Sequence, residues 1–172
     1  MISMPTGVRD ARAQDAPVIA RVTLDCWRDA GVPAELLGDA TVLDVTSAWA
    51  AAITAPPSPR HLVLIATDAR GDVCGYAALG PSDDPDADAS ETCLHSLEVD
   101  PQARRLGHGS RLLAAAADMC ATEVLTAWCG VDDAARRTFL ESAGWAADGS
   151  WRDLQAPDGR TRREIRLSTA VR

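Results

Sequence analysis

The sequence contains no lysine, and its 17 basic residues other than histidine are all arginines. Without lysine, the chain has neither the lysine of a Walker-type phosphate loop nor a Schiff-base nucleophile. The 25 acidic residues outnumber the arginines and give a net charge of -8, which repels the phosphate backbone of nucleic acids. Aromatic residues make up only 4% of the chain, so base-stacking surfaces are poorly supplied. The composition therefore predicts that nucleic acid is not a partner.

Long apolar runs are missing as well. No stretch approaches the roughly 20 consecutive apolar residues of a membrane-spanning helix, and residues 1–6 lack the basic start and apolar run of a secretory signal. We therefore expect a cytoplasmic protein without a membrane partner. The length of 172 residues, 47% of them hydrophobic and 24% charged, suits a single domain over residues 1–172 with a buried core.

Metal-ligand patterns are also absent from the sequence. The cysteines are odd in number and scattered, without a C-x-x-C pair, and the three histidines show no metal-ligand spacing along a helix. We therefore expect no metal site and no disulfide framework, and we interpret the cysteines as small, buried apolar residues. They are Cys26, Cys74, Cys93, Cys120 and Cys129.

Hydrophobic periodicity predicts a mixed α/β (α+β) fold in which helices cover a sheet. The expected strands cover residues 7–11, 61–67, 73–79, 93–99, 123–130, 145–154 and 162–168. The expected helices run from Asp15 to Gly31, from Thr41 to just before Pro56, from His108 to Cys120 and from Asp133 to Gly144. The second helix is expected to bury Val42, Val45, Ala48, Trp49, Ala52 and Ile53. A turn at Pro157-Asp158-Gly159 is expected between the last two strands.

The segment that carries most chemical information is 97–113, in which a strand runs into a turn of arginines and glycines and then into a helix. Unsatisfied amides and the positive dipole end at a helix N-terminus favour an anion. Gly107 and Gly109 lack a Cβ, so the amides of residues 105–110 can approach a diphosphate closely. Positive charge is added by Arg104, Arg105 and Arg111.

This segment has two other interpretations. A dinucleotide-binding fingerprint does not fit, because Leu112 stands where its third glycine belongs. A turn followed by a helix cap, without a ligand, is the structural alternative.

This segment resembles the pyrophosphate loop of the GNAT superfamily of acetyl-coenzyme A dependent N-acetyltransferases, Gln/Arg-x-x-Gly-x-Gly/Ala. Residues 104–109, Arg-Arg-Leu-Gly-His-Gly, match that loop, and the residues before and after it are similar to the family's fourth strand and following helix. Residues 133–145, Asp-x-x-Arg-Arg-x-Phe-Leu-Glu-Ser-Ala-Gly-Trp, are similar to the family's Asn-x-x-Ala-Arg-x-Phe-Tyr-x-x-x-Gly-Phe. The order of elements over residues 8–169 agrees with the GNAT pattern.

The resemblance implies a mostly antiparallel central sheet flanked by helices, whose fourth and fifth strands splay apart and hold the pantetheine arm of acetyl-CoA. It implies transfer of an acetyl group from acetyl-CoA to a primary amine of a small molecule or peptide, by direct attack in a ternary complex. By position, Leu97, Glu98 and Val99 hold the pantetheine and thioester, and Asp133 and Arg136 lie beside the cofactor. The implied pyrophosphate loop is Arg104, Arg105, Leu106, Gly107, His108, Gly109 and Ser110.

The sequence departs from the family pattern at the position of the acid. Leu140 stands where the family has a tyrosine, so no hydroxyl is available there to protonate the leaving thiolate. Either water or another group protonates it, or the protein is an acyl-CoA-binding regulatory or accessory domain with little catalytic activity. Asp133, where the family often has asparagine, is also expected to cap its helix.

The base that deprotonates the amine is sought on the strand before the loop. Regular alternation predicts that one face carries Glu91, Cys93, His95, Leu97 and Val99. The resemblance implies a carboxylate on this strand acting through water, so Glu91 is the first candidate and His95 the second. Glu98 faces away under regular pairing, but a bulge would invert the faces and make Glu98 the candidate.

Two charged segments have two interpretations each. The acidic residues between Pro81 and Glu91 indicate a mobile, solvated surface loop, or a negative potential that attracts a cationic amine. The arginines near the C-terminus are expected to alternate across an exposed strand, with Arg162 and Arg166 on one face, or to form a contact in a homodimer. These segments contain Asp83, Asp84, Asp86 and Asp88, and Arg160, Arg162, Arg163 and Arg166.

Overall fold

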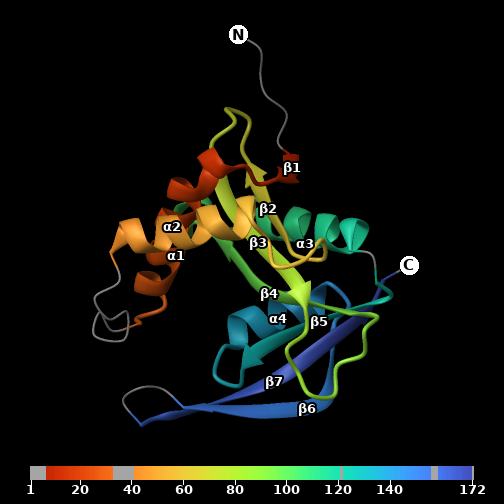
Figure 1. Cartoon of the computed structure of the whole chain (residues 1–172). Coiled ribbons are helices and arrows are strands. Elements are labelled where there is room, and N and C mark those ends of the chain that lie inside the picture. The colour runs from red at the N-terminus through yellow and green to blue at the C-terminus, as the bar shows by residue number, and fades with distance from the viewer. Residues whose placement is uncertain (1–6, 33–40, 121, 156–158, 172) are drawn as a thin grey trace.

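A seven-stranded sheet crosses the molecule in the order β1-β2-β3-β4-β5-β7-β6 (Figure 1). The computed structural model describes residues 7–32, 41–120, 122–155 and 159–171. The recorded strand pairs are antiparallel except β4 with β5, which is parallel. This mixed, mostly antiparallel sheet confirms the predicted fold class. The strands are β1 (Gly7–Asp10), β2 (Leu62–Thr67), β3 (Val73–Pro81), β4 (Glu91–Val99), β5 (Val124–Gly130), β6 (Ala146–Gln155) and β7 (Thr161–Ala170).

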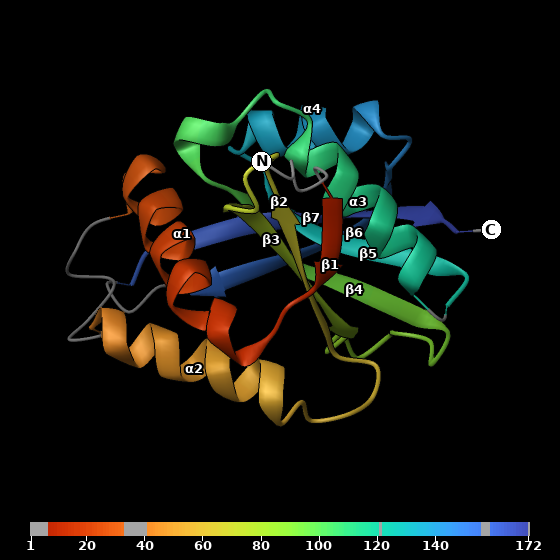
Figure 2. The same cartoon turned by 90° about the horizontal axis from the view of Figure 1, so that it is seen from above.

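Four α-helices in the described ranges cover the two faces of the sheet (Figure 2). On one face lie α1 (Ala16–Asp29) and α2 (Val42–Thr54), and on the other lie α3 (His108–Met119) and α4 (Ala134–Ser142). Two 3-10 turns, η1 (Ala13–Asp15) and η3 (Pro101–Ala103), precede α1 and follow β4. The predicted order of elements is confirmed, and their boundaries shift by one or two residues.

Side-chain caps explain where two of the helices begin. The Thr41 hydroxyl accepts a hydrogen bond from the Asp44 amide, and the Asp44 carboxylate accepts one from the Thr41 amide, which forms a capping box. The Asp133 carboxylate accepts a hydrogen bond from the Arg136 amide (3.0 Å), as predicted for a cap. Asp15 occupies the expected cap position of α1, but its buried carboxylate instead pairs with Arg9 (2.8 Å) and makes no cap hydrogen bond.

Alternation along β2 sends its side chains into two separate cores. Leu64 packs with Leu112 of α3 in the larger core, whereas Ile65 packs with Tyr76 beneath α1. Full burial of one large apolar side chain contributes about 1.5–3 kcal/mol. The two cores therefore hold both layers of helices firmly on the sheet.

The apolar stripe of α2 is narrower than predicted. Trp49 and Ile53 pack into the core beneath α1, but Val42 is 59% exposed and Ala48 and Ala52 also face solvent. Residues four apart on a helix share one line along its surface, and only that line meets the rest of the molecule here. The prediction that all six apolar residues are buried is therefore wrong for the flanking positions.

Cysteine and histidine side chains form no disulfide and no cluster of potential metal ligands in the part of the chain that the structure describes. All five cysteines are free thiols, and four of them are buried as predicted. Over the described ranges, no three or more metal-ligating side chains gather, and no helix has the length and apolar character needed to span a bilayer. The expected turn residues Pro157 and Asp158 lie outside the described residues.

Candidate functional site

The strands β4 and β5 are paired at one end and separate toward the other. Their parallel pairing consists of Glu91 with Val124, Thr92 with Leu125 and Cys93 with Thr126. Both strands continue beyond these pairs, to Val99 and to Gly130, so they splay apart after Cys93 as predicted. The edge of residues 94–99 that faces β5 has no strand partner in the described sheet, and an extended ligand can pair with such an edge.

A bulge interrupts β4 where the splay begins. The consecutive β3 residues Ala78 and Leu79 pair with Ser96 and Leu94, so His95 is the extra residue. Because side chains alternate along a strand, one extra residue shifts the alternation of everything that follows. The prediction of regular alternation is therefore wrong beyond His95.

The bulge changes which residues of β4 face α1. The side chains of Leu97 and Val99 pack with the larger core on the α3 face, instead of sharing a face with Cys93 and His95. Glu98 faces α1, where it lies beside Cys26. The bulge that the alternative candidate Glu98 required is therefore present.

Glu98 is half-buried at the splayed end of β4. Loss of contact with water raises its pKa, and the nearby Arg136, Cys26 and Arg104 counteract part of that effect. Burial also raises the pKa of Cys26 to about 12, so this thiol stays protonated and donates to the Val99 carbonyl (3.3 Å). A carboxylate with a raised pKa is suited to accept a proton near neutral pH.

The other two candidate bases lie elsewhere on β4. Glu91 begins the paired end, where its carbonyl accepts a hydrogen bond from Arg60, and its buried Oε2 has no partner in the described residues. His95 is exposed at the bulge, with Nε2 3.1 Å from the Pro81 carbonyl. The structure therefore does not bring Glu91, His95 and Glu98 together.

The turn between β4 and α3 presents its backbone at a helix N-terminus. Gly107, the residue before α3, has φ +82°, a left-handed conformation that favours glycine, and Arg105 has φ +65°. A Cβ on Gly109 would lie 3.3 Å from Cζ of Phe139. Gly109 thus allows α3 to pack on α4, in addition to the role of backbone exposure expected for it.

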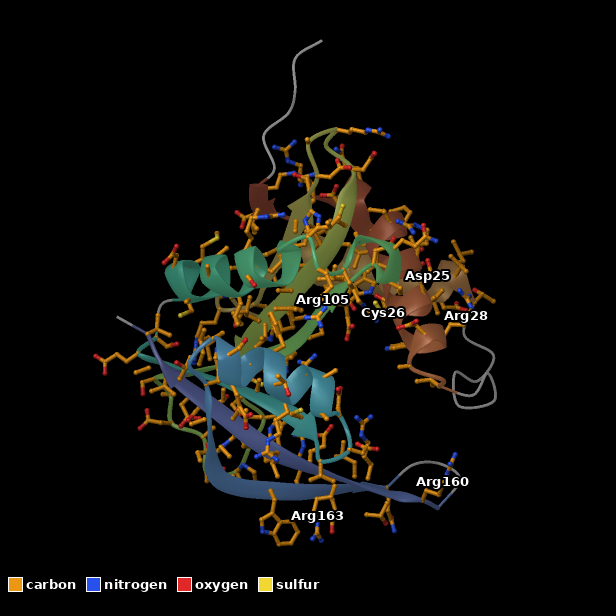
Figure 3. All side chains as sticks on the ribbon, turned by 180° about the vertical axis from the view of Figure 1, so that it is seen from behind. Asp25, Cys26, Arg28, Arg105, Arg160 and Arg163 are labelled. Atoms are coloured by element: carbon orange, nitrogen blue, oxygen red, sulfur yellow. The ribbon has the colours of Figure 1, made fainter. Side chains whose placement is uncertain are left out.

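The arginines of this turn divide between two tasks. Arg104 reaches away to α1, where it pairs with Asp29 (2.6 Å) and donates to the Val99 carbonyl (3.3 Å). The charge of Arg104 is therefore paired with a carboxylate, whereas the sequence predicted that it would add positive charge to an anion site. Arg105 stays exposed on the turn (Figure 3), and Arg111 donates to Nδ1 of His108 (2.9 Å).

The remaining loop residues differ in exposure. His108 is buried, and burial lowers its pKa, which favours the neutral ring. Leu106 is 64% exposed, and Ser110 is also exposed at the start of α3. The amides at this helix end thus lie beside exposed side chains and can be reached from solvent.

One arginine of α4 extends into the splayed region. Nη1 of Arg136 lies 3.4 Å from the Leu97 carbonyl oxygen on β4. Its Nε is buried and has no hydrogen-bond partner in the described residues. Leu140, one helical turn further along, is 1% exposed and belongs to the larger core.

A cavity of about 110 Å³ lies where β4 and β5 separate. Its lining combines charged groups with an indole, and consists of Ser82, Asp83, Asp84, Cys93, Leu94, His95, Trp128 and Arg152. The guanidinium of Arg152 lies 4.2 Å from the centre of the Trp128 ring.

The acidic segment before β4 is anchored to β5 and β7. Asp84 accepts hydrogen bonds from Nε1 of Trp128 (3.0 Å) and from Arg166 (3.3 Å), and Asp86 also pairs with Arg166. Arg166 is 7% exposed and holds Asp148 as well (2.7 Å). The expectation of a solvated loop is therefore wrong for Asp84, and Arg166 does not lie on an exposed strand surface.

Sequence reasoning did not place His61, Trp128 or Arg166 at this site. His61 and His95 both approach Gly80, because a Cβ built there would meet each ring. Trp128 lies between two core residues of β5, so strand alternation could have predicted that it faces away from the larger core. Arg166 pairs with residues far away in the sequence, which no local pattern reveals.

The chain is similar to known proteins both in sequence and in structure. The acetyltransferase (GNAT) family matches residues 25–145. No curated protein sequence gives a significant match. A solved structure of yncA from Salmonella typhimurium, with its cofactor acetyl-CoA, is 20% identical with a TM-score of 0.74, covering 98% of this chain and 95% of that chain.

Two further solved structures are similar over almost their whole length. An N-acetyltransferase from Staphylococcus aureus Mu50 is 14% identical with a TM-score of 0.74, covering 98% of this chain and 100% of that chain. A ribosomal-protein-alanine N-acetyltransferase from Brucella melitensis is 20% identical with a TM-score of 0.73, covering 95% of this chain and 98% of that chain. At these identities, the likeness establishes the fold.

Proposed function

Because the chain belongs to the acetyltransferase (GNAT) family, we propose that it transfers an acetyl group from acetyl-CoA to a primary amine by direct attack in a ternary complex. The observation that carries this proposal is the splay of β4 from β5, followed directly in the chain by an accessible helix N-terminus. The acceptor amine belongs to a small molecule or a peptide. The acetyl-CoA found with the Salmonella yncA protein supports the choice of acyl donor.

The residues present fit a coenzyme A thioester. The free edge of β4 offers main-chain groups of Leu97 and Val99 to an extended pantetheine arm. The amides of residues 105–110 are directed toward the pyrophosphate by the left-handed turn at Gly107. At the start of α4, Asp133 caps the helix, and the Arg136 guanidinium reaches toward the Leu97 carbonyl on the unpaired edge of β4.

Glu98 is the base in this proposal, in preference to Glu91 and His95. The attacking amine must first lose its ammonium proton, and Glu98 accepts that proton, directly or through water. Its raised pKa and its place at the splayed end support this assignment. Glu91 lies at the paired end, where β5 closes the sheet.

Calorimetric titration with acetyl-CoA tests the donor half of the proposal. We expect micromolar affinity, which corresponds to about -8 kcal/mol. Gly107→Val should abolish binding, because valine resists the φ of +82° that orients the turn. Gly144→Val is a matched control, since Gly144 also has a positive φ (+89°) after a helix but lies outside the turn. Equal binding by all three folded proteins would contradict the placement of the pyrophosphate.

A second candidate function is an acyl-CoA-binding regulatory domain, and Leu140 is the observation that favours it, because the helix offers no hydroxyl there. Coenzyme A release in the presence of amines separates the two functions. Turnover with any small-molecule or peptide amine supports the transferase. Tight binding without turnover across a broad amine panel supports the regulatory domain.

A further inference from the structure

The inner face of α4 carries two departures from the GNAT sequence pattern, four residues apart. Arg136 stands where the pattern has alanine, and Leu140 stands where it has tyrosine. Residues at positions i and i+4 of a helix are neighbours on one face. The chain therefore loses a hydroxyl and gains a guanidinium on the same face of the same helix.

The guanidinium reaches the place where the thioester is proposed to lie. Nη1 of Arg136 is 3.4 Å from the Leu97 carbonyl oxygen, on the unpaired edge of β4. Leu97 is one of the two residues whose main chain is proposed to hold the pantetheine and thioester. Arg136 thus spans the splayed region from α4 to β4.

This arginine is also short of partners. Its Nε is buried and unpaired in the described residues, and its contact with Leu97 is long for a hydrogen bond. Glu98, on the other side of β4, is close enough for the two charges to interact. A buried donor without an acceptor is costly, so the site favours an additional anionic group.

We propose that Arg136 stabilises the thiolate that leaves when the amine attacks the thioester, in place of the hydroxyl that is missing at Leu140. This inference rests on the proposed transferase function. The amine nitrogen forms a bond to the carbonyl carbon, the C–S bond breaks, and its electron pair goes to sulfur. Glu98 passes the ammonium proton to solvent water before the attack, and its carboxylate then accepts the proton that the nitrogen loses as the amide forms.

Arginine performs this role by charge rather than by proton transfer. Its side chain is not deprotonated in proteins, so coenzyme A leaves as a thiolate and takes a proton from solvent after release. Fixed positive charge directed at a developing negative charge is an effective form of catalysis in a site with little water.

The binary complex with coenzyme A tests the inference without any amine. Ultraviolet absorbance of the thiolate, followed against pH, gives the pKa of the bound thiol in the wild type, Arg136→Met and Arg136→Lys. We expect the wild type to lower that pKa by about 1 unit or more relative to free coenzyme A. Arg136→Met should lose the shift, and Arg136→Lys should keep part of it. Arg137→Met is the control, because Arg137 is exposed and pairs with Glu141.

Turnover then checks the catalytic consequence. Arg136→Met should lower kcat with acetyl-CoA about 10²-fold, and much less with the acetyl selenoester of coenzyme A, whose leaving group is more acidic. Equal losses with both donors, or a thiol pKa unchanged by Arg136→Met, would overturn the role of Arg136. Failure of the wild type to bind coenzyme A would instead overturn the proposed function, and this inference with it.

Discussion

The two ends of β4 carry the same type of side chain in different surroundings. At the paired end, Glu91 lies opposite Val124 of β5, and its carbonyl is held by Arg60. At the splayed end, Glu98 lies among Cys26, Arg104 and Arg136. The position of the neighbouring strand, rather than the residue type, therefore determines which carboxylate lies beside the unpaired edge of β4.

The largest effect that would test this comparison is on turnover. Glu98→Gln keeps the size of the side chain but removes its basicity, so kcat should fall about 10²- to 10⁴-fold while acetyl-CoA binding is retained. Steady-state release of coenzyme A and calorimetry measure the two quantities separately. Glu91→Gln should change kcat by less than about threefold, because the paired end is closed.

The opposite result would reverse the roles of the two carboxylates. If Glu91→Gln abolished turnover and Glu98→Gln did not, the paired end would contain the base, and the splay would serve the donor alone. Equal loss in both variants would mean that each carboxylate supports the fold of β4. Thermal unfolding of both proteins distinguishes that last case from a chemical effect.

The next largest effect concerns what holds the paired end closed. Arg166 of β7 binds Asp84 in the segment that enters β4, and both side chains are 9% exposed. Arg166→Met leaves Asp84 buried without its principal cation, and breaking such a pair costs about 3–5 kcal/mol. Urea unfolding should therefore show that the free energy of unfolding falls by about 3 kcal/mol.

Arg163→Met provides the matched control on the same strand. Arg163 pairs with Asp153 at the surface, where both side chains are more than one third exposed, so its loss should cost less than about 1 kcal/mol. Similar losses of unfolding free energy in the two variants would mean that the pairing of Arg166 with Asp84 does not stabilise the paired end of β4.

The fold could be predicted from sequence because its signals are local. Thr41 and Asp133 mark helix starts through caps formed within three residues, and β2 alternates cleanly between two cores. The bulge at His95 could not be predicted in the same way, since it depends on how β4 pairs with β3. That single residue determines whether Glu98 lies on the same face of β4 as Cys93.

The candidate site was predictable in its backbone and less so in its side chains. Gly107 and Gly109 were expected to let backbone amides approach a ligand, and the structure adds that Gly107 takes a left-handed conformation at the turn before α3. Arg104 was expected beside an anion but pairs with Asp29, 75 residues away in sequence. Asp84 was expected in solvent but is buried against Arg166. Ion pairs often join residues that are far apart in the sequence, and a local sequence pattern does not show which of them meet in the fold.

The smallest predicted effect is on the pH dependence of stability, and it distinguishes Glu98 from an ordinary structural carboxylate. Burial raises the pKa of Glu98 in the folded protein, so the unfolded chain ionises this group more readily. The free energy of unfolding therefore falls as pH rises from the ordinary glutamate pKa, about 4.3, through the raised folded value. Glu98→Gln removes this penalty, so its Tm should exceed that of the wild type at neutral pH and approach it in acid.

Asp15 supplies the control of opposite sign. Arg9 and the Arg12 amide outweigh burial and lower the pKa of Asp15, so its contribution to stability is present above the ordinary aspartate pKa and is lost as pH falls through the lowered value. Asp15→Asn should therefore lower Tm at neutral pH and converge with the wild type in acid. Tm measured against pH for both variants should show deviations of opposite sign. A Tm of Glu98→Gln below that of the wild type at neutral pH would mean that the Glu98 carboxylate stabilises the fold through Arg104 and Arg136. That result would contradict a raised pKa for Glu98 and its assignment as the base.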